Sequence, residues 1–178
     1  MNVWLSNSQV IHATSSDPLT QPFERQGVVA GVFSHEPIAA RAPTGETVVW
    51  YTASKCCVNG CQRCTGCHDG ISPKHCGICD PPAPGAVANR NHSVNLPTYM
   101  VYSSSPHGPW SEPAEVPGTD VFADSNFAPV ILGNGSLVAL TRGAVIHGEN
   151  WKNVSTYKEV GKWHDAGEDP YLWCVATL

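Results

Sequence analysis

Charged side chains are scarce in this sequence and make up only 14% of its 178 residues. The formal net charge of −5 disfavours binding to nucleic acid. No window of about 18 residues is apolar enough for a helical membrane span. Residues 1–4 do not begin a basic segment followed by an apolar one, so no secretory leader is recognised there. A neutral or weakly cationic partner fits this composition best.

The sequence also lacks apolar positions spaced at the helical period over more than one or two turns. Glycine and proline are plentiful instead, with 16 and 15 residues, which favours short strands joined by tight turns. Hydrophobic residues amount to 42%, enough for one domain with a sizeable core. We therefore predict an all-β chain that forms a single domain over residues 1–178.

A repeated plan of polar group, proline, strand, glycine turn and strand organises the chain. The first copy spans residues 34–52 and turns at Ala42–Gly45, and the second spans residues 124–140 and turns at Gly133–Gly135. The segment 168–173 reads as the opening of a third copy. These spacings predict hairpins at the first two copies.

A second repeated phrase, rich in serine and proline, precedes each hairpin, at residues 9–24 and 100–112. The first phrase opens with a predicted strand over Val10–Thr14. When a cysteine-rich insert at residues 55–88 is left out of the count, the repeated unit is about 55 residues long, the size of one four-stranded propeller blade. About three blades cannot close a propeller, which has about four to eight, so we expect a fragment. A small open β-sandwich with coincidental repeats is the alternative.

The insert holds seven of the eight cysteines, at positions 56, 57, 61, 64, 67, 76 and 79, and Cys174 stands apart. Two C-x2-C pairs, beginning at Cys61 and Cys76, could bind zinc. Adjacent cysteines and irregular spacing favour disulfides in an exported loop, with free thiols as a third possibility. No cofactor is therefore predicted. Sequons at Asn91, Asn134 and Asn153 fit the same exported, glycosylated protein.

Carboxylates open the inner strand of each unit: Glu36, Asp124 and Glu168. In a propeller these positions surround one cavity, and glycoside hydrolysis needs an acid and a base there. A single carboxylate before a strand more often caps a turn. The hypothesis of an active site therefore rests on the recurrence of carboxylates at the same position in each unit. Further candidates for contacts with substrate are His35, Asn126 and Asp169, of which His35 is equally well read as a buried structural residue.

Two arginines and the tryptophans complete the candidates. Arg142 could bind a carboxylate or a substrate hydroxyl, whereas Arg41 is better interpreted as an exposed residue at a strand end. Six tryptophans are many for this length, and most are expected in the core. We select Trp173 as the one best placed to stack on a sugar.

The phrases rich in serine and proline at residues 13–23 and 103–110 resemble the five-bladed β-propeller glycosidases of the arabinanase and β-xylosidase type. The same resemblance extends to His35-Glu36-Pro37, Asn126 to Pro129 and Glu168-Asp169-Pro170. The resemblance implies inverting hydrolysis by an aspartate base, a pKa-tuning aspartate and a glutamate acid on successive blades. Glu168 then matches the acid and Asp124 the pKa-tuning aspartate.

The base of that family lies in an Asp-Pro context on the first blade, and this sequence departs from the pattern there. Glu36 is the candidate substitute, whereas Asp17-Pro18 belongs to an outer turn and does not match. The resulting hypothesis is a fragment of a secreted glycosidase that acts on a polysaccharide or oligosaccharide. The alternatives are a non-catalytic carbohydrate-binding propeller, an inactive truncated homologue and a zinc-dependent interaction module. The sequence does not indicate an oligomeric state.

Overall fold

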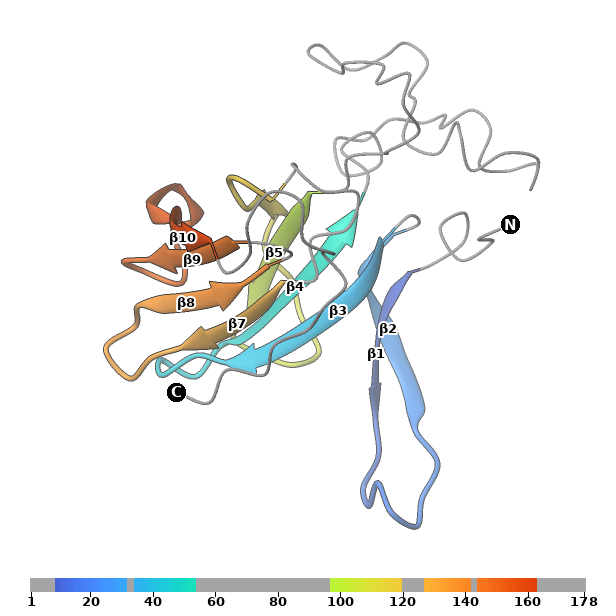
Figure 1. Cartoon of the computed structure of the whole chain (residues 1–178). Helices are drawn as coiled ribbons and strands as arrows, with labels where there is room; N and C mark the ends of the chain where they lie inside the picture. The colour runs from blue at the N-terminus through green and yellow to red at the C-terminus, as the bar shows by residue number, and fades with distance from the viewer. Residues whose placement is uncertain (1–8, 32–33, 54–96, 120–126, 142–143, 163–178) are drawn as a thin grey trace, which may run out of the picture.

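A computed structural model describes residues 9–31, 34–53, 97–119, 127–141 and 144–162. It contains ten strands in chain order and one short 3-10 helix, η2 (Figure 1). The strands are β1 (Val10–Thr14), β2 (Glu24–Ala30), β3 (Ser34–Arg41), β4 (Thr47–Ala53), β5 (Thr98–Ser103), β6 (Ala114–Glu115), β7 (Ala128–Ile131), β8 (Leu137–Leu140), β9 (Ala144–Gly148) and β10 (Lys158–Lys162), and η2 is Val154–Thr156.

The strands form three antiparallel sheets. β1 pairs with β2, while β3 to β6 and β7 to β10 each form a four-stranded meander in which neighbours in the sheet are neighbours in the chain. No α-helix occurs in the described ranges, and the prediction of an all-β chain is confirmed there. Both predicted hairpins are confirmed as β3–β4 and β7–β8, and the predicted strand at residues 10–14 is β1. The described strands do not close into a propeller ring.

Two glycines make the hairpin turns. Gly45 has φ 98° and donates its N–H to the Ala42 carbonyl, and Gly135 has φ 84° and donates to the Leu132 carbonyl. A positive φ costs glycine nothing because it has no Cβ, so these positions fix where each strand reverses.

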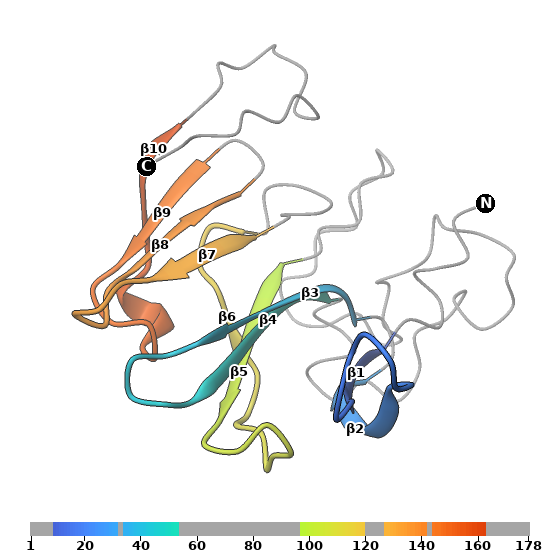
Figure 2. The ribbon, with the colours of Figure 1, turned by 90° about the horizontal axis from the view of Figure 1, so that it is seen from below.

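The sheet of β3 to β6 lies between the other two sheets (Figure 2). Alternation along β4 explains this position: Val48 and Trp50 pack toward the β7–β10 sheet, while Val49 and Tyr51 pack toward β1 and β2. A strand that is apolar on both faces needs a packed layer on each side, and β4 has both.

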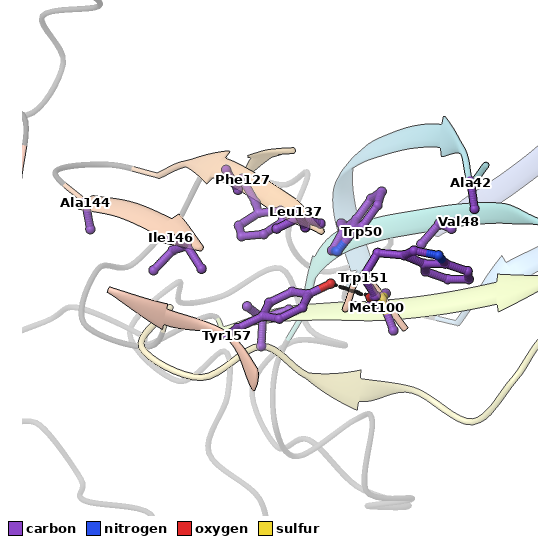
Figure 3. Packing of buried hydrophobic residues seen from close by; sticks show 12 residues of the cluster. Ala42, Val48, Trp50, Met100, Phe127, Leu137, Ala144, Ile146, Trp151 and Tyr157 are labelled. Carbon is purple, nitrogen blue, oxygen red and sulfur yellow. Dashed lines mark hydrogen bonds between the residues drawn. The ribbon is translucent and has the colours of Figure 1, made fainter. Parts of the chain in front are cut away.

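The larger core joins the two four-stranded sheets (Figure 3). Trp50, Met100, Leu137 and Ile146 are each no more than 1% exposed. Complete burial of such a side chain stabilises the fold by about 1.5–3 kcal/mol. The Tyr157 hydroxyl closes this core by donating a hydrogen bond to the Trp151 carbonyl.

Two sequence-based predictions concern parts of the chain outside this description. The cysteine-rich insert and Cys174 lie outside the described residues, as does the third repeat at residues 168–173. Among the described residues, no helix has the length and apolar character needed to cross a membrane.

Candidate active site

A β-bulge lies at the start of β3. Ser34 and His35 pair with Ala53 and Thr52, and pairing resumes with Ile38 opposite Trp50. Glu36 and Pro37 therefore lie opposite the single residue Tyr51, the two-against-one arrangement that defines a bulge. Pro37 fits this position because β3 is an edge strand and proline has no N–H to donate.

Glu36 has a backbone conformation that glutamate rarely adopts. Its φ is 52°, and it is the one described residue other than glycine with a positive φ. This conformation costs a residue with a Cβ about 1–2 kcal/mol, and bulges with a positive φ at the first position usually carry glycine there. Strained residues in bulges recur at active sites, where the bulge re-aims a side chain. Glu36 is an exposed residue.

β3 and β7 lie beside each other although they belong to different sheets. Each is the first strand of its meander and an edge strand, and each carries a proline near its start, Pro37 and Pro129. Both strands run in the same direction, so their starts lie at one end of the molecule (Figures 1 and 2). This end is named the β3–β7 entry end, and Glu36 lies there.

Phe127, the residue just before β7, packs against Trp50 of β4. Its ring centroid lies 6.0 Å from that of Trp50, with 35° between the ring planes, and its side chain is 7% exposed. The contact joins the residue just before β7 to the centre of β4. Phe127 thus packs the start of β7 against β4.

The structure describes only part of the predicted site. Glu36 lies at the entry end, and the backbone of His35 lies in β3 beside it. The remaining candidates lie outside the described residues: Asp124, Asn126, Arg142, Glu168, Asp169 and Trp173. The predicted gathering of carboxylates around one cavity stays a prediction.

Arg41 lies at the opposite end of β3. It is five residues beyond Glu36 in the strand, about 16 Å at a rise of about 3.3 Å per residue, and its side chain is exposed. The prediction of an exposed strand-end residue is confirmed. Trp50 and Trp151 belong to the core, as expected for most of the tryptophans.

Asp17 is a turn residue between β1 and β2. Its carboxylate accepts hydrogen bonds from the Thr20 hydroxyl at 2.6 Å and from the Leu19 N–H at 3.1 Å. The Thr20 hydroxyl first, and the Leu19 N–H second, hold the pKa of Asp17 below its ordinary value. A hydrogen-bonded carboxylate in the β1–β2 turn agrees with the prediction that Asp17 is not the catalytic base.

Sequence reasoning missed two features of the described residues. The strained φ of Glu36 is one, and the only sequence signal for it was the following proline. The other is an edge-to-face pair of rings, His12 and His107, with centroids 5.3 Å apart. No group of three or more His, Cys, Asp or Glu residues suited to a metal ion occurs in the part of the chain that the structure describes.

No protein-family model and no curated protein matches the sequence. Among solved structures, the fold is similar to Zg3597, a family 117 glycoside hydrolase produced by the marine bacterium Zobellia galactanivorans, with a TM-score of 0.50 and 16% sequence identity. The similarity covers 85% of this chain but only 40% of that one. The chain thus shares an all-β fold with part of a glycoside hydrolase.

Proposed function

We propose that this chain is part of a five-bladed β-propeller glycoside hydrolase that cleaves a polysaccharide or oligosaccharide with inversion. Two sequential four-stranded meanders have the form of propeller blades, and β3 and β7 would be their innermost strands. The side-by-side position of β3 and β7 supports this assignment. The likeness to part of a glycoside hydrolase supports the carbohydrate substrate.

The position and backbone conformation of Glu36 are the main support for this proposal. The starts of innermost strands surround the central cavity of a propeller, and Glu36 occupies such a start in a strained bulge. A purely structural carboxylate has no need of a conformation that costs about 1–2 kcal/mol. Placing a reactive side chain explains both the bulge and the positive φ.

The proposed reaction uses two carboxyl groups. Glu168 would protonate the leaving oxygen, and Glu36 would accept a proton from the water that attacks the anomeric carbon from the opposite face. Inversion requires these groups to lie roughly 6.5–9.5 Å apart, which leaves room for the water. Asp124 would tune the pKa of the acid. His35, Asn126, Arg142 and Asp169 would bind hydroxyl groups, and Trp173 would stack on a sugar ring.

The test is hydrolysis of a panel of plant, algal and microbial polysaccharides by the chain and by its longest natural form. Glu36→Gln and Glu168→Gln should each lower kcat about 100-fold or more, at the level of a lost acid or base. Glu159→Gln changes an exposed carboxylate of β10 and should have no effect. The first-formed sugar, followed by NMR, should have the inverted anomeric configuration. Retention, or hydrolysis indifferent to both active-site variants, would contradict the proposal.

The same panel separates catalysis from binding. Saturable glycan binding without hydrolysis, retained in Glu168→Gln, would assign the chain to non-catalytic carbohydrate recognition instead. Thermal melting of each variant, compared with that of the unmodified chain, excludes unfolding as the cause of a lost signal.

The cysteines bear on localisation. We propose that the chain is secreted and that disulfides staple its insert, because seven cysteines within residues 56–79 suit an oxidising compartment. Thiol alkylation before and after reduction, read by mass spectrometry, should show protected cysteines and no stoichiometric zinc in the purified chain. Fully alkylated cysteines, or one zinc per chain, would overturn this assignment.

A further inference from the structure

Two sequons lie in turns at one end of the β7–β10 sheet. Asn134 occupies the β7–β8 turn, and Asn153 is the N-cap of η2 in the β9–β10 connection. The Trp151 N–H donates to the Gly135 carbonyl at 2.9 Å and ties the two turns together. Both asparagines are exposed, so each can carry a bulky group without displacing the core.

The two sequons share one local geometry. The Oδ1 atom of Asn134 accepts hydrogen bonds from the Ser136 hydroxyl at 2.7 Å and the Ser136 N–H at 3.0 Å. The Oδ1 atom of Asn153 accepts from the Ser155 hydroxyl at 2.7 Å and the Ser155 N–H at 3.2 Å. All four bonds use the carbonyl oxygen of the amide, so a substituent on Nδ2 leaves them in place.

We infer that Asn134 and Asn153 are N-glycosylation sites and that both glycans lie at the end of the molecule opposite Glu36. In the transfer, Nδ2 forms a bond with the anomeric carbon of a lipid-pyrophosphate-linked oligosaccharide. The bond from that carbon to the pyrophosphate oxygen breaks, the lipid pyrophosphate leaves, and the amide loses one proton to the transferase.

The position of the glycans follows from the β3–β4 turn. Lys152 Nζ lies 3.6 Å from a carboxylate oxygen of Glu46, which places the β9–β10 connection beside the turn where β3 ends. Glu36 lies near the start of β3, at the entry end. Figure 1 shows the β3–β4 and β7–β8 turns together at the left of the molecule and the start of β3 at the right. Glycans on these turns therefore leave the entry end uncovered.

The timing of the transfer follows from burial. Ser136 is 7% exposed in the folded chain, so a transferase that reads its hydroxyl has to act before the β7–β8 hairpin packs. Ser155 is exposed, and its sequon is accessible in the folded chain as well. The sequence supplies a control in the same region: Asn150 is exposed, but Lys152 stands where a sequon needs serine or threonine.

The experiment translates the full chain, behind a secretory leader, in the presence of microsomes and in secreting eukaryotic cells. We expect a gel shift that peptide-N-glycosidase reverses, and peptide mapping should place glycans at Asn134 and Asn153 but not at Asn150. Asn134→Asp and Asn153→Asp keep the side-chain oxygen that the turn needs and remove Nδ2. Each should abolish one glycan and leave the melting temperature of the deglycosylated chain unchanged.

Ser136→Thr and Ser155→Thr should retain glycosylation, because the hydroxyl is kept. The microsomal assay reads modification during translation, so a chain that fails to be secreted still gives a result. Fully unmodified Asn134 and Asn153 peptides in the microsomal product would overturn the inference. So would glycans that the glycosidase removes only after denaturation, because they would not lie on exposed turns.

Discussion

The rings of Trp50 and Phe127 meet across the boundary between the two four-stranded sheets, with centroids 6.0 Å apart. Trp50 is completely buried in β4, and Phe127 stands just before β7. One aromatic contact therefore holds the start of β7 beside the sheet that contains Glu36.

Replacing Phe127 with alanine should lower the free energy of unfolding by about 3–5 kcal/mol, because the change leaves a cavity beside Trp50. Urea denaturation followed by tryptophan fluorescence measures this. Phe23 is 63% exposed, and Phe23→Ala is the matched control with an expected change within about 0.5 kcal/mol. Equal effects of the two variants would contradict the assignment of Phe127 to the core.

Gly148→Ala should be strongly destabilising. A Cβ at position 148 would lie 2.5 Å from Cδ1 of Tyr157, whose ring is buried and whose hydroxyl is hydrogen-bonded to the Trp151 carbonyl. We expect a loss of about 1–3 kcal/mol, typical of overpacking, read as a lower urea midpoint. Gly161 lies in the adjacent strand β10, where an added Cβ would have no described atom within 4 Å, so Gly161→Ala should be neutral or slightly stabilising.

The sequence predicted the hairpins because their turns carry unambiguous chemistry. Gly45 and Gly135 take the positive φ values that the turns require, and apolar strand segments flank them. β4 is recognisable for the same reason, although its burial on both faces depends on partners from distant parts of the chain. Local pattern thus fixes where strands reverse, while the order of the layers is a tertiary property.

The pattern of apolar residues in the sequence did not predict β2 and β10. β2 has mostly exposed residues, and β10 is a largely polar edge strand, Lys158–Lys162, so neither shows the apolar alternation that marks a half-buried strand. The proline after Glu36 is the only sequence signal there, and it does not specify a positive φ, because glutamate has no preference for that conformation. The recurrence of carboxylates predicts the candidate site, whereas the strain that supports Glu36 is a property of the folded backbone.

Stability should fall as the pH rises from about 10 to about 12. Burial raises the pKa of Tyr51 to about 12 and raises that of Tyr157 as well. In this range the folded chain keeps protons that the unfolded chain has lost, so each added pH unit favours unfolding. Tyr51→Phe should make the pH dependence shallower, by at most about 1.4 kcal/mol per pH unit. Urea midpoints at several alkaline pH values test this, and an unchanged slope would contradict it.

The strain at Glu36 is measurable by comparing glycine with alanine at that position. Glu36→Ala and Glu36→Gly both remove the side chain, but only glycine accepts a φ of 52° without cost. The glycine variant should therefore be more stable than the alanine variant by about 1 kcal/mol. Ala39 lies in the same strand with an ordinary φ, and Ala39→Gly should instead destabilise the chain by about 0.5–1 kcal/mol. If glycine destabilises both positions alike, Glu36 is not strained, and the main structural support for its role in catalysis is lost.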